Sequence, residues 1–263
     1  MKITDLRYLE WSKTRDSSGT AGSYLKSYSY ANGIKKYYKL SYFDDVNKMF
    51  GYESINELIA SKILDELKYE HVNYELSYSK IIIDGTENAT YVSSSLDYKK
   101  PSETKTTFEN FYKLNKEKDE DVMSFINRFG FTKEVYQMLI IDFLICNRDR
   151  HGANIELLYN YKTSSWRMAP LFDHGLSLLS PSYFDKDIMK YDIKKDVKVN
   201  SFIGSTDLRE NLKLVPTSFF PTIKIDFDEL IDSLDIQEET YLSKVKELLK
   251  WRWSCLEDIR NKR

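Results

Sequence analysis

The first part of the chain alternates apolar and polar positions, a pattern typical of β-strands. One such run covers residues 23–31, and another covers residues 35–43. Between them stands Asn32-Gly33, whose two residues both tolerate a positive φ. The pattern therefore predicts a β-hairpin with a two-residue turn.

Three further strands are expected before residue 100. One precedes the hairpin at residues 6–13, and two follow it at residues 74–83 and 88–96, separated by the turn dipeptide Asp84-Gly85. Small residues fill positions 16–23, which predicts a loop between the first two strands.

Helical spacing appears once in the first part and dominates the second. Residues 55–67 carry apolar side chains at intervals of three and four, which predicts an amphipathic helix. After Pro101, residues 133–145 are apolar on nearly every side, so this helix should be buried at the centre. A short hairpin is expected at 155–170, and helical periodicity returns from about residue 226.

These elements predict an α+β protein with two parts. We expect a strand-rich part at residues 1–97 and a mostly helical part at residues 98–263. The chain has 263 residues, of which 41% are hydrophobic, enough for a substantial core. With 39 Lys and Arg against 41 Asp and Glu, no basic surplus points to nucleic acid.

The two cysteines and the apolar runs point to the cytoplasm. Cys146 and Cys255 stand far apart and form no CxxC pair, as expected in a reducing compartment. The amino terminus meets charges too early for a signal peptide. The most apolar run, residues 138–146, contains Asp142 and is too short to span a bilayer.

The densest group of reactive side chains follows the predicted buried helix, in NRDRHGAN at residues 147–154. Asp149 and Asn154 are five positions apart, and Asp173 follows in LFDHG after the predicted hairpin. Each residue alone is more often a cap or turn residue. Together they suit phosphoryl transfer, which needs a carboxylate near the attacking hydroxyl and oxygen ligands that hold Mg²⁺ against ATP phosphates. This predicts Asp149 as catalytic acid/base and Asn154 and Asp173 as metal ligands.

NRDRHGAN followed by MAPLFDHG resembles the catalytic and metal-binding segments of HipA-like kinases, a bacterial family with a protein-kinase-like fold. DRHGAN is also similar to the D-R-H-x-x-N loop of phosphatidylinositol kinases. Ordinary protein kinases have His-Arg-Asp and Asp-Phe-Gly, whereas His151 is displaced here and His174 replaces the Phe. The resemblance runs from about residue 10 to about residue 215. It implies a two-lobed kinase-like fold, with an antiparallel-sheet N-lobe containing one helix and a larger helical C-lobe.

The resemblance also implies a lysine on the third strand and a glutamate on the following helix, which together position the ATP phosphates. Lys39 and Glu57 occupy these places, with Lys35 and Lys36 as alternatives for the lysine and Glu53 for the glutamate.

The small-residue loop falls where such kinases cover the phosphates, because backbone N–H groups can turn toward an anion there. Ser18, Gly19 and Gly22 are the expected phosphate-loop residues. In HipA-like kinases a serine of this loop can be phosphorylated, which makes Ser17, Ser18 and Ser23 candidates.

The resemblance thus implies a serine/threonine kinase of the HipA toxin type, acting on a protein or on itself, with an antitoxin as a possible partner. A small-molecule or lipid-head-group kinase and a nucleotide-binding pseudokinase are the alternatives within the fold. Two other classes fit less well. A metal-dependent hydrolase would use Asp149, His151, Asp173 and His174, and a thiol enzyme would use Cys146 with one of these histidines.

Overall fold

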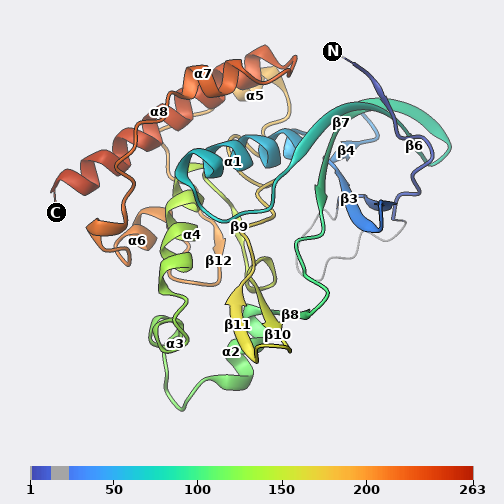
Figure 1. Ribbon diagram of the computed structural model, residues 1–263. Coiled ribbons are helices and arrows are strands. Elements are labelled where there is room, and N and C mark those ends of the chain that lie inside the picture. The colour runs from blue at the N-terminus through green and yellow to red at the C-terminus, as the bar shows by residue number, and fades with distance from the viewer. Residues whose placement is uncertain (1, 13–23, 263) are drawn as a thin grey trace.

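Figure 1 shows the computed structural model, which describes residues 2–12 and 24–262. Its largest sheet has five strands in the order β1-β6-β7-β3-β2. Neighbouring strands are antiparallel except for the parallel pair β1 and β6. The strands are β1 (Thr4–Asp5), β2 (Lys26–Ala31), β3 (Ile34–Leu40), β6 (Glu75–Ile83) and β7 (Thr86–Leu96).

Both predicted hairpins are present in this sheet. Asn32 and Gly33 join β2 to β3 with φ values of 52° and 77°, and Asp84 and Gly85 join β6 to β7 with 48° and 79°. These positive values explain why Asn, Asp and Gly stand at the turns. The register places Lys26 directly opposite Lys39, so the two side chains share one face of the sheet.

The strand expected at residues 6–13 is not formed over residues 6–12, and β1 lies just before it. Leu6 and Leu9 are both buried, and the Leu9 N–H donates to the Leu6 carbonyl at 3.1 Å. The segment therefore turns to bury two leucines on one side, which an extended strand cannot do at a spacing of three. Ser12 then reaches the edge of β2, where its N–H donates to the Lys26 carbonyl.

Helix α1 (Glu53–Leu67) packs on the large sheet, as the spacing of residues 55–67 predicts. Ile59, Ile63 and Leu64 are fully buried along it. The helix ends at Lys68, which takes the left-handed conformation of a helix C-terminus at φ 57°. Two short strands, β4 (Phe43–Asp44) and β5 (Met49–Phe50), connect β3 to α1.

The second part of the chain is mostly helical and surrounds α4 (Thr132–Leu144), which is buried as predicted. The other helices are α2 (Phe108–Asn115), α3 (Val122–Arg128), α5 (Asp185–Lys190), α6 (Leu208–Leu212), α7 (Phe227–Asp232) and α8 (Glu239–Lys262), with 3₁₀ turns at Gly152–Asn154 and Thr217–Phe219. Helix α8, near the carboxyl end of the chain, crosses the molecule beside α7 and α5 (Figure 1).

The predicted hairpin of the second part is present as β10 (Glu156–Asn160) and β11 (Ser165–Met168), with a third strand, β8 (Glu103–Thr107), beside β10. The polar sequence of β8 gave no strand signal. Its buried Glu103 is neutralised by Arg167 of β11, whose Nε lies 2.9 Å from the carboxylate. A separate two-residue parallel pair is formed by β9 (Asp149–Arg150) and β12 (Asn200–Ser201).

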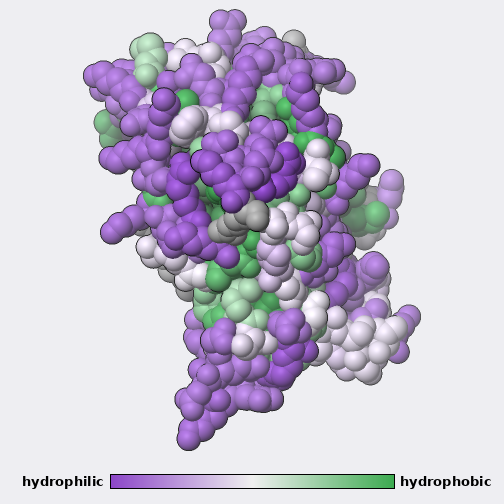
Figure 2. Space-filling model, turned by 90° about the vertical axis from the view of Figure 1, so that its left-hand side faces the viewer, coloured by the Kyte–Doolittle hydropathy of each residue, from purple (hydrophilic) through white to green (hydrophobic). Residues whose placement is uncertain are grey.

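One large apolar cluster runs through α1, α4 and α8, and a smaller one lies under the large sheet around Leu40, Ile81 and Val92. Trp253 of α8 belongs to the large cluster. On the face shown in Figure 2, hydrophilic side chains predominate and hydrophobic ones appear mainly in the middle. Within the described ranges, no helix is long and apolar enough to cross a membrane.

Candidate active site

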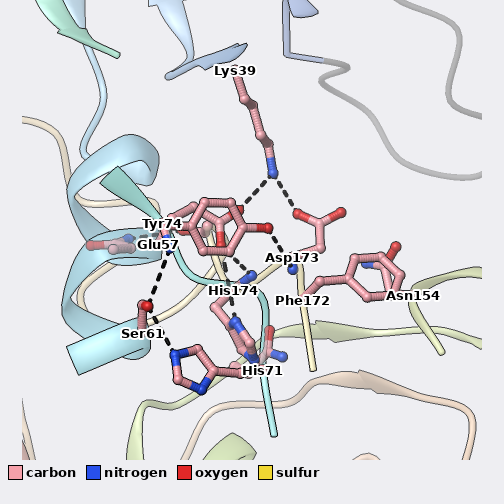
Figure 3. Close-up of polar contacts among 12 residues, drawn as sticks. Lys39, Glu57, Ser61, His71, Tyr74, Asn154, Phe172, Asp173 and His174 are labelled. Carbon is pink, nitrogen blue, oxygen red and sulfur yellow. Dashed lines mark hydrogen bonds and ion pairs between the residues drawn. The ribbon is translucent and has the colours of Figure 1, made fainter. Parts of the chain in front are cut away.

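Three predicted site residues from distant parts of the chain meet at one point (Figure 3). Lys39 extends from β3, Glu57 from α1, and Asp173 from the loop after β11. The Lys39 Nζ lies 3.0 Å from Glu57 Oε1 and also donates to Asp173 Oδ1. One ammonium group is therefore held between two carboxylates, one of which, Glu57, is almost completely buried.

Burial and these contacts together shift the pKa values of the three side chains. Burial alone would lower the pKa of Lys39, but Asp173 and Glu57 outweigh it and hold that pKa well above its ordinary value. Burial likewise opposes the charge of Asp173, and Lys39 overcomes it, so the pKa of Asp173 is lowered. For Glu57 burial prevails and its pKa is raised.

The alternatives for the lysine and the glutamate lie in other surroundings. Lys36 pairs with Glu75 at 2.5 Å, and Lys35 lies over the rings of Tyr28 and Tyr37. Glu53 is buried and accepts hydrogen bonds from the Tyr183 hydroxyl at 2.7 Å and the Tyr42 N–H at 3.0 Å. Lys39 donates to Asp173 itself, and Glu57 accepts from the backbone N–H of His174, the next residue.

The backbone around Asp173 is shaped by its neighbours. Asp173 takes a left-handed conformation with φ 58°, and the following His174 N–H donates to Glu57 Oε2 at 2.8 Å. At Gly175, a Cβ atom would lie 3.2 Å from the Glu53 Cβ and 3.4 Å from Lys39 Nζ and Glu57 Oε1, so a glycine avoids a tight contact with α1 here. The Asn56 side chain of α1 donates to the carbonyl of Gly175 at 2.8 Å and fixes the loop to the helix.

Asp149 and Asn154 lie together on the preceding loop. The Asn154 Nδ2 donates to the Asp149 carbonyl at 2.9 Å, which orients its Oδ1 away from that bond. Asn200 of β12 donates to Asp149 Oδ1 at 3.3 Å, and His151 Nε2 lies 3.9 Å from Asp149 Oδ2. Burial raises the pKa of Asp149, while His151 and Asn200 act against it.

A buried ion pair supports this loop from behind. The Arg150 guanidinium lies 2.9 Å from Asp142 of α4, and both side chains are buried. The same arginine donates to the carbonyls of Asn154 and Phe172, at 3.0 and 2.9 Å. It thus ties the Asp149 loop to the Asp173 loop. Arg148 of the same loop donates instead to the Tyr191 hydroxyl, at 2.8 Å.

The histidines and cysteines fit the competing chemistries poorly. His174 is buried, and neither ring nitrogen has a hydrogen-bond partner in the described part of the chain. Burial holds its pKa well below the ordinary value, so the ring is neutral. Cys146 is buried and its pKa is raised by burial, which leaves an unreactive thiol. Both ring nitrogens of His71 form hydrogen bonds, one with the Ser61 hydroxyl and one with the Tyr69 carbonyl, so this histidine has a structural role.

Asp173 and Asn154 carry oxygen atoms, the ligand type that Mg²⁺ prefers. Among the residues that the structure describes, no three His, Cys, Asp or Glu side chains form a metal cage of their own. Mg²⁺ does not require such a cage, because it commonly binds one or two protein oxygens together with phosphates and water. The Asn154 amide nitrogen is occupied by the Asp149 carbonyl, so its oxygen is the atom left for a cation.

The phosphate-loop candidates Ser17, Ser18, Gly19, Gly22 and Ser23 lie outside the described residues. Two described residues that flank this segment, Ser12 and Lys26, are hydrogen-bonded to each other. The Ser12 N–H donates to the Lys26 carbonyl at 2.9 Å, and the Lys26 N–H donates to Ser12 Oγ at 3.1 Å.

Sequence reasoning missed several residues of the site. Asn200 lies 51 positions after Asp149 and reaches it only through the parallel pair of β9 and β12. Tyr74 places its buried hydroxyl 3.4 Å from the Asp173 N–H, which donates to it. Tyr24 lies over Lys39, with the ring centre 5.2 Å from Nζ. No spacing pattern indicates these contacts, because each depends on how distant strands are paired.

Comparisons with known proteins support the fold. The chain is similar in structure to the proinflammatory kinase CtkA of Helicobacter pylori, with a TM-score of 0.67 and 16% identity, over 100% of this chain and 98% of that one. The chain has a kinase fold. No family model matches the sequence, and no curated protein matches it.

A second solved structure contains HipA of Shewanella oneidensis MR-1 with HipB and operator DNA. It matches with a TM-score of 0.48 and 15% identity, over 95% of this chain and 68% of that one. The assignment of the fold therefore relies on the structural likeness to CtkA alone. The expected α+β, two-lobed kinase-like architecture is confirmed, and the structural likeness to CtkA covers the whole chain.

Proposed function

We propose that this protein is an ATP- and Mg²⁺-dependent kinase that transfers the γ-phosphoryl group to a serine or threonine hydroxyl of a protein. The observation that carries the proposal is the contact of Lys39 with both Glu57 and Asp173. In a kinase fold, this contact joins the sheet, the helix behind it and the metal-binding loop into one phosphate site.

Each residue of the site has a role in this proposal. Lys39, braced by Glu57, positions the α- and β-phosphates, and Asp173 and Asn154 hold Mg²⁺ on them. The bound metal would neutralise charge on the phosphates. Asp149 orients the acceptor hydroxyl and accepts its proton, and burial of this carboxylate makes it a better base than an exposed aspartate. Ser18, Gly19 and Gly22 would cover the phosphates.

The lobes and partners remain predictions from the sequence. We place the lobe boundary between residues 97 and 98, at the end of β7. The HipA-like motif supports a protein acceptor, a toxin-type role with an antitoxin partner, a cytoplasmic location, and autophosphorylation at Ser17, Ser18 or Ser23. Phosphopeptide mapping after incubation with Mg-ATP tests the last of these, and phosphate found only outside residues 13–23 would contradict it.

Two alternatives share the same site. A kinase acting on a small alcohol or lipid head group is favoured by the likeness of DRHGAN to phosphatidylinositol kinases. A pseudokinase would bind nucleotide without transfer, and the joint presence of Lys39, Glu57, Asp149, Asn154 and Asp173 argues against it.

One experiment separates the three. The wild-type protein is incubated with γ-labelled ATP and Mg²⁺, alone, with casein, and with phosphatidylinositol vesicles. Label on Ser or Thr of casein or of the protein itself is the expected result. Label only in the lipid fraction would support the lipid kinase instead. Thermal stabilisation by Mg-ATP without any transfer would identify the pseudokinase, and neither binding nor transfer would contradict all three.

A further inference from the structure

A second lysine faces the proposed phosphate site beside Lys39. Lys26 of β2 is paired directly with Lys39 of β3, so both side chains leave the sheet on the same face as near neighbours. The surrounding protein and the charge of Lys39 lower the pKa of Lys26, and Asp173 and Glu57 act on it in the opposite sense. Lys26 therefore lies within electrostatic range of the site residues.

The two lysines differ in how their charges are balanced. Lys39 is held by two carboxylates. Lys26 forms no ion pair with any residue in the ranges 2–12 and 24–262, whereas Lys36 on the opposite face of the same hairpin pairs with Glu75. Like charges directly across a strand pair are destabilising. A bound anion would offset the repulsion between Lys26 and Lys39.

The backbone of Lys26 is also fixed on both sides. Its carbonyl and N–H bond to Ser12 on one edge, while β3 pairs with it on the other. These bonds set the backbone position of Lys26, and its side chain leaves the sheet on the same face as that of Lys39.

We propose that Lys26 is a second phosphate-binding lysine, which contacts the polyphosphate of the nucleotide alongside Lys39. The inference rests on the proposed kinase function and adds a positioning residue to it. The net charge supports it. Glu57, Asp173 and Asp149 lie in or beside the site, so Lys26 would add a positive charge to those that Lys39 and Mg²⁺ bring to the phosphates.

Calorimetric titration of Lys26→Met with Mg-ATP, Mg-ADP and adenosine tests the proposal. We expect the Kd for Mg-ATP to rise roughly tenfold, in line with the loss of one charge-assisted hydrogen bond. Adenosine lacks phosphates, so its Kd should stay within about twofold of wild type. Lys26→Gln should show the same pattern, and Lys26→Arg should bind Mg-ATP nearly as wild type does.

The matched control is Lys36→Met, which removes the same charge from the other face of the hairpin and should leave all three Kd values unchanged. Without nucleotide, Lys26→Met should melt at the wild-type temperature or slightly above it, because a like-charge neighbour is removed. The proposal is overturned if Lys26→Met and Lys26→Gln bind Mg-ATP as wild type does, or if they lose adenosine equally. Failure of wild type itself to bind Mg-ATP would instead refute the kinase function.

Discussion

Lys39 keeps its charge in a buried position because two carboxylates surround it. Burying a lone ammonium group is expensive, and a paired one is retained where its partners also hydrogen-bond to it. Glu57 accepts from both Lys39 and the His174 N–H, so one buried carboxylate fixes the lysine and the backbone beside Asp173. The charged side chains of the site therefore keep one another in position.

The pKa of Asp149 gives a prediction for the reaction rate. Burial raises this pKa, and the hydrogen bond from Asn200 acts against the rise. A base must be deprotonated, so transfer should fall as pH drops through a pKa above the ordinary aspartate value. Asn200→Ala should move this acidic limb to higher pH. The pH profile of kcat/KM measures it, with Asn88→Ala on β7 as a control that leaves the limb in place; an unshifted limb in Asn200→Ala would contradict the assignment.

His174 gives a prediction for stability. Its pKa is well below 6.5 in the folded protein and near 6.5 in the unfolded chain, so the unfolded chain binds more protons below that pH. Stability should therefore fall as pH drops below about 6.5. Protonation of this histidine in the unfolded chain should therefore make the protein less stable at pH 5 than at pH 7.5.

Urea unfolding of wild type and His174→Leu at both pH values measures the effect. The difference in unfolding free energy between the two pH values should be smaller in the variant than in wild type, whatever the variant's stability at pH 7.5. An unchanged pH dependence would show that His174 is not held neutral in the folded state.

At the scale of elements, α1 joins the two parts of the molecule. Its Asn56 donates to the carbonyls of Gly175 and Ser177, at 2.8 and 3.1 Å, and accepts from the Tyr241 hydroxyl of α8 at 2.5 Å. One buried side chain on this helix therefore links the Asp173 loop to the carboxyl-terminal helix.

Asn56→Ala should lower the free energy of unfolding by about 3 kcal/mol, because it leaves two buried carbonyls and a hydroxyl without this partner. Asn88→Ala on β7 removes only a bond to the nearby Thr86 carbonyl and should stay within about 0.5 kcal/mol of wild type. Urea unfolding of both variants measures the difference. Equal effects of the two substitutions would show that the Asn56 contacts do not stabilise the fold.

The pair of Arg150 and Asp142 joins α4 to both catalytic loops. Arg150→Met leaves Asp142 buried and unpaired, and should cost about 3–5 kcal/mol of unfolding free energy. Adding Asp142→Asn removes the stranded charge and should recover part of this loss. Denaturant unfolding of the single and double variants measures the coupling, and additive losses would mean that the pair does not act as a unit.

For the whole molecule, the sequence indicated the order of most elements and some residues of the candidate site. The alternation around Asn32-Gly33, the helix at Glu53–Leu67 and the buried helix at Thr132–Leu144 all depend on local patterns, and the structure contains them. The motif residues Lys39, Glu57 and Asp173 do converge.

The features that the sequence did not reveal depend on pairing at long range. The polar strand Glu103–Thr107 exists because Arg167 neutralises Glu103 and β10 supplies its backbone partners. The expected strand at residues 6–13 was wrong because burial of Leu6 and Leu9 prevails over alternation. Asn200 meets Asp149, and Lys26 meets Lys39, only once the strands are in register.

The most direct test of the account is phosphoryl transfer from γ-labelled ATP by wild type, Asp149→Ala and Asp173→Ala. The two carboxylates have separate roles here, so both variants should lose at least about 100-fold in transfer rate. Asp149→Ala should still bind Mg-ATP, since its role is in the transfer step, whereas Asp173→Ala should bind it more weakly. Transfer at the wild-type rate in both variants would contradict the proposed site.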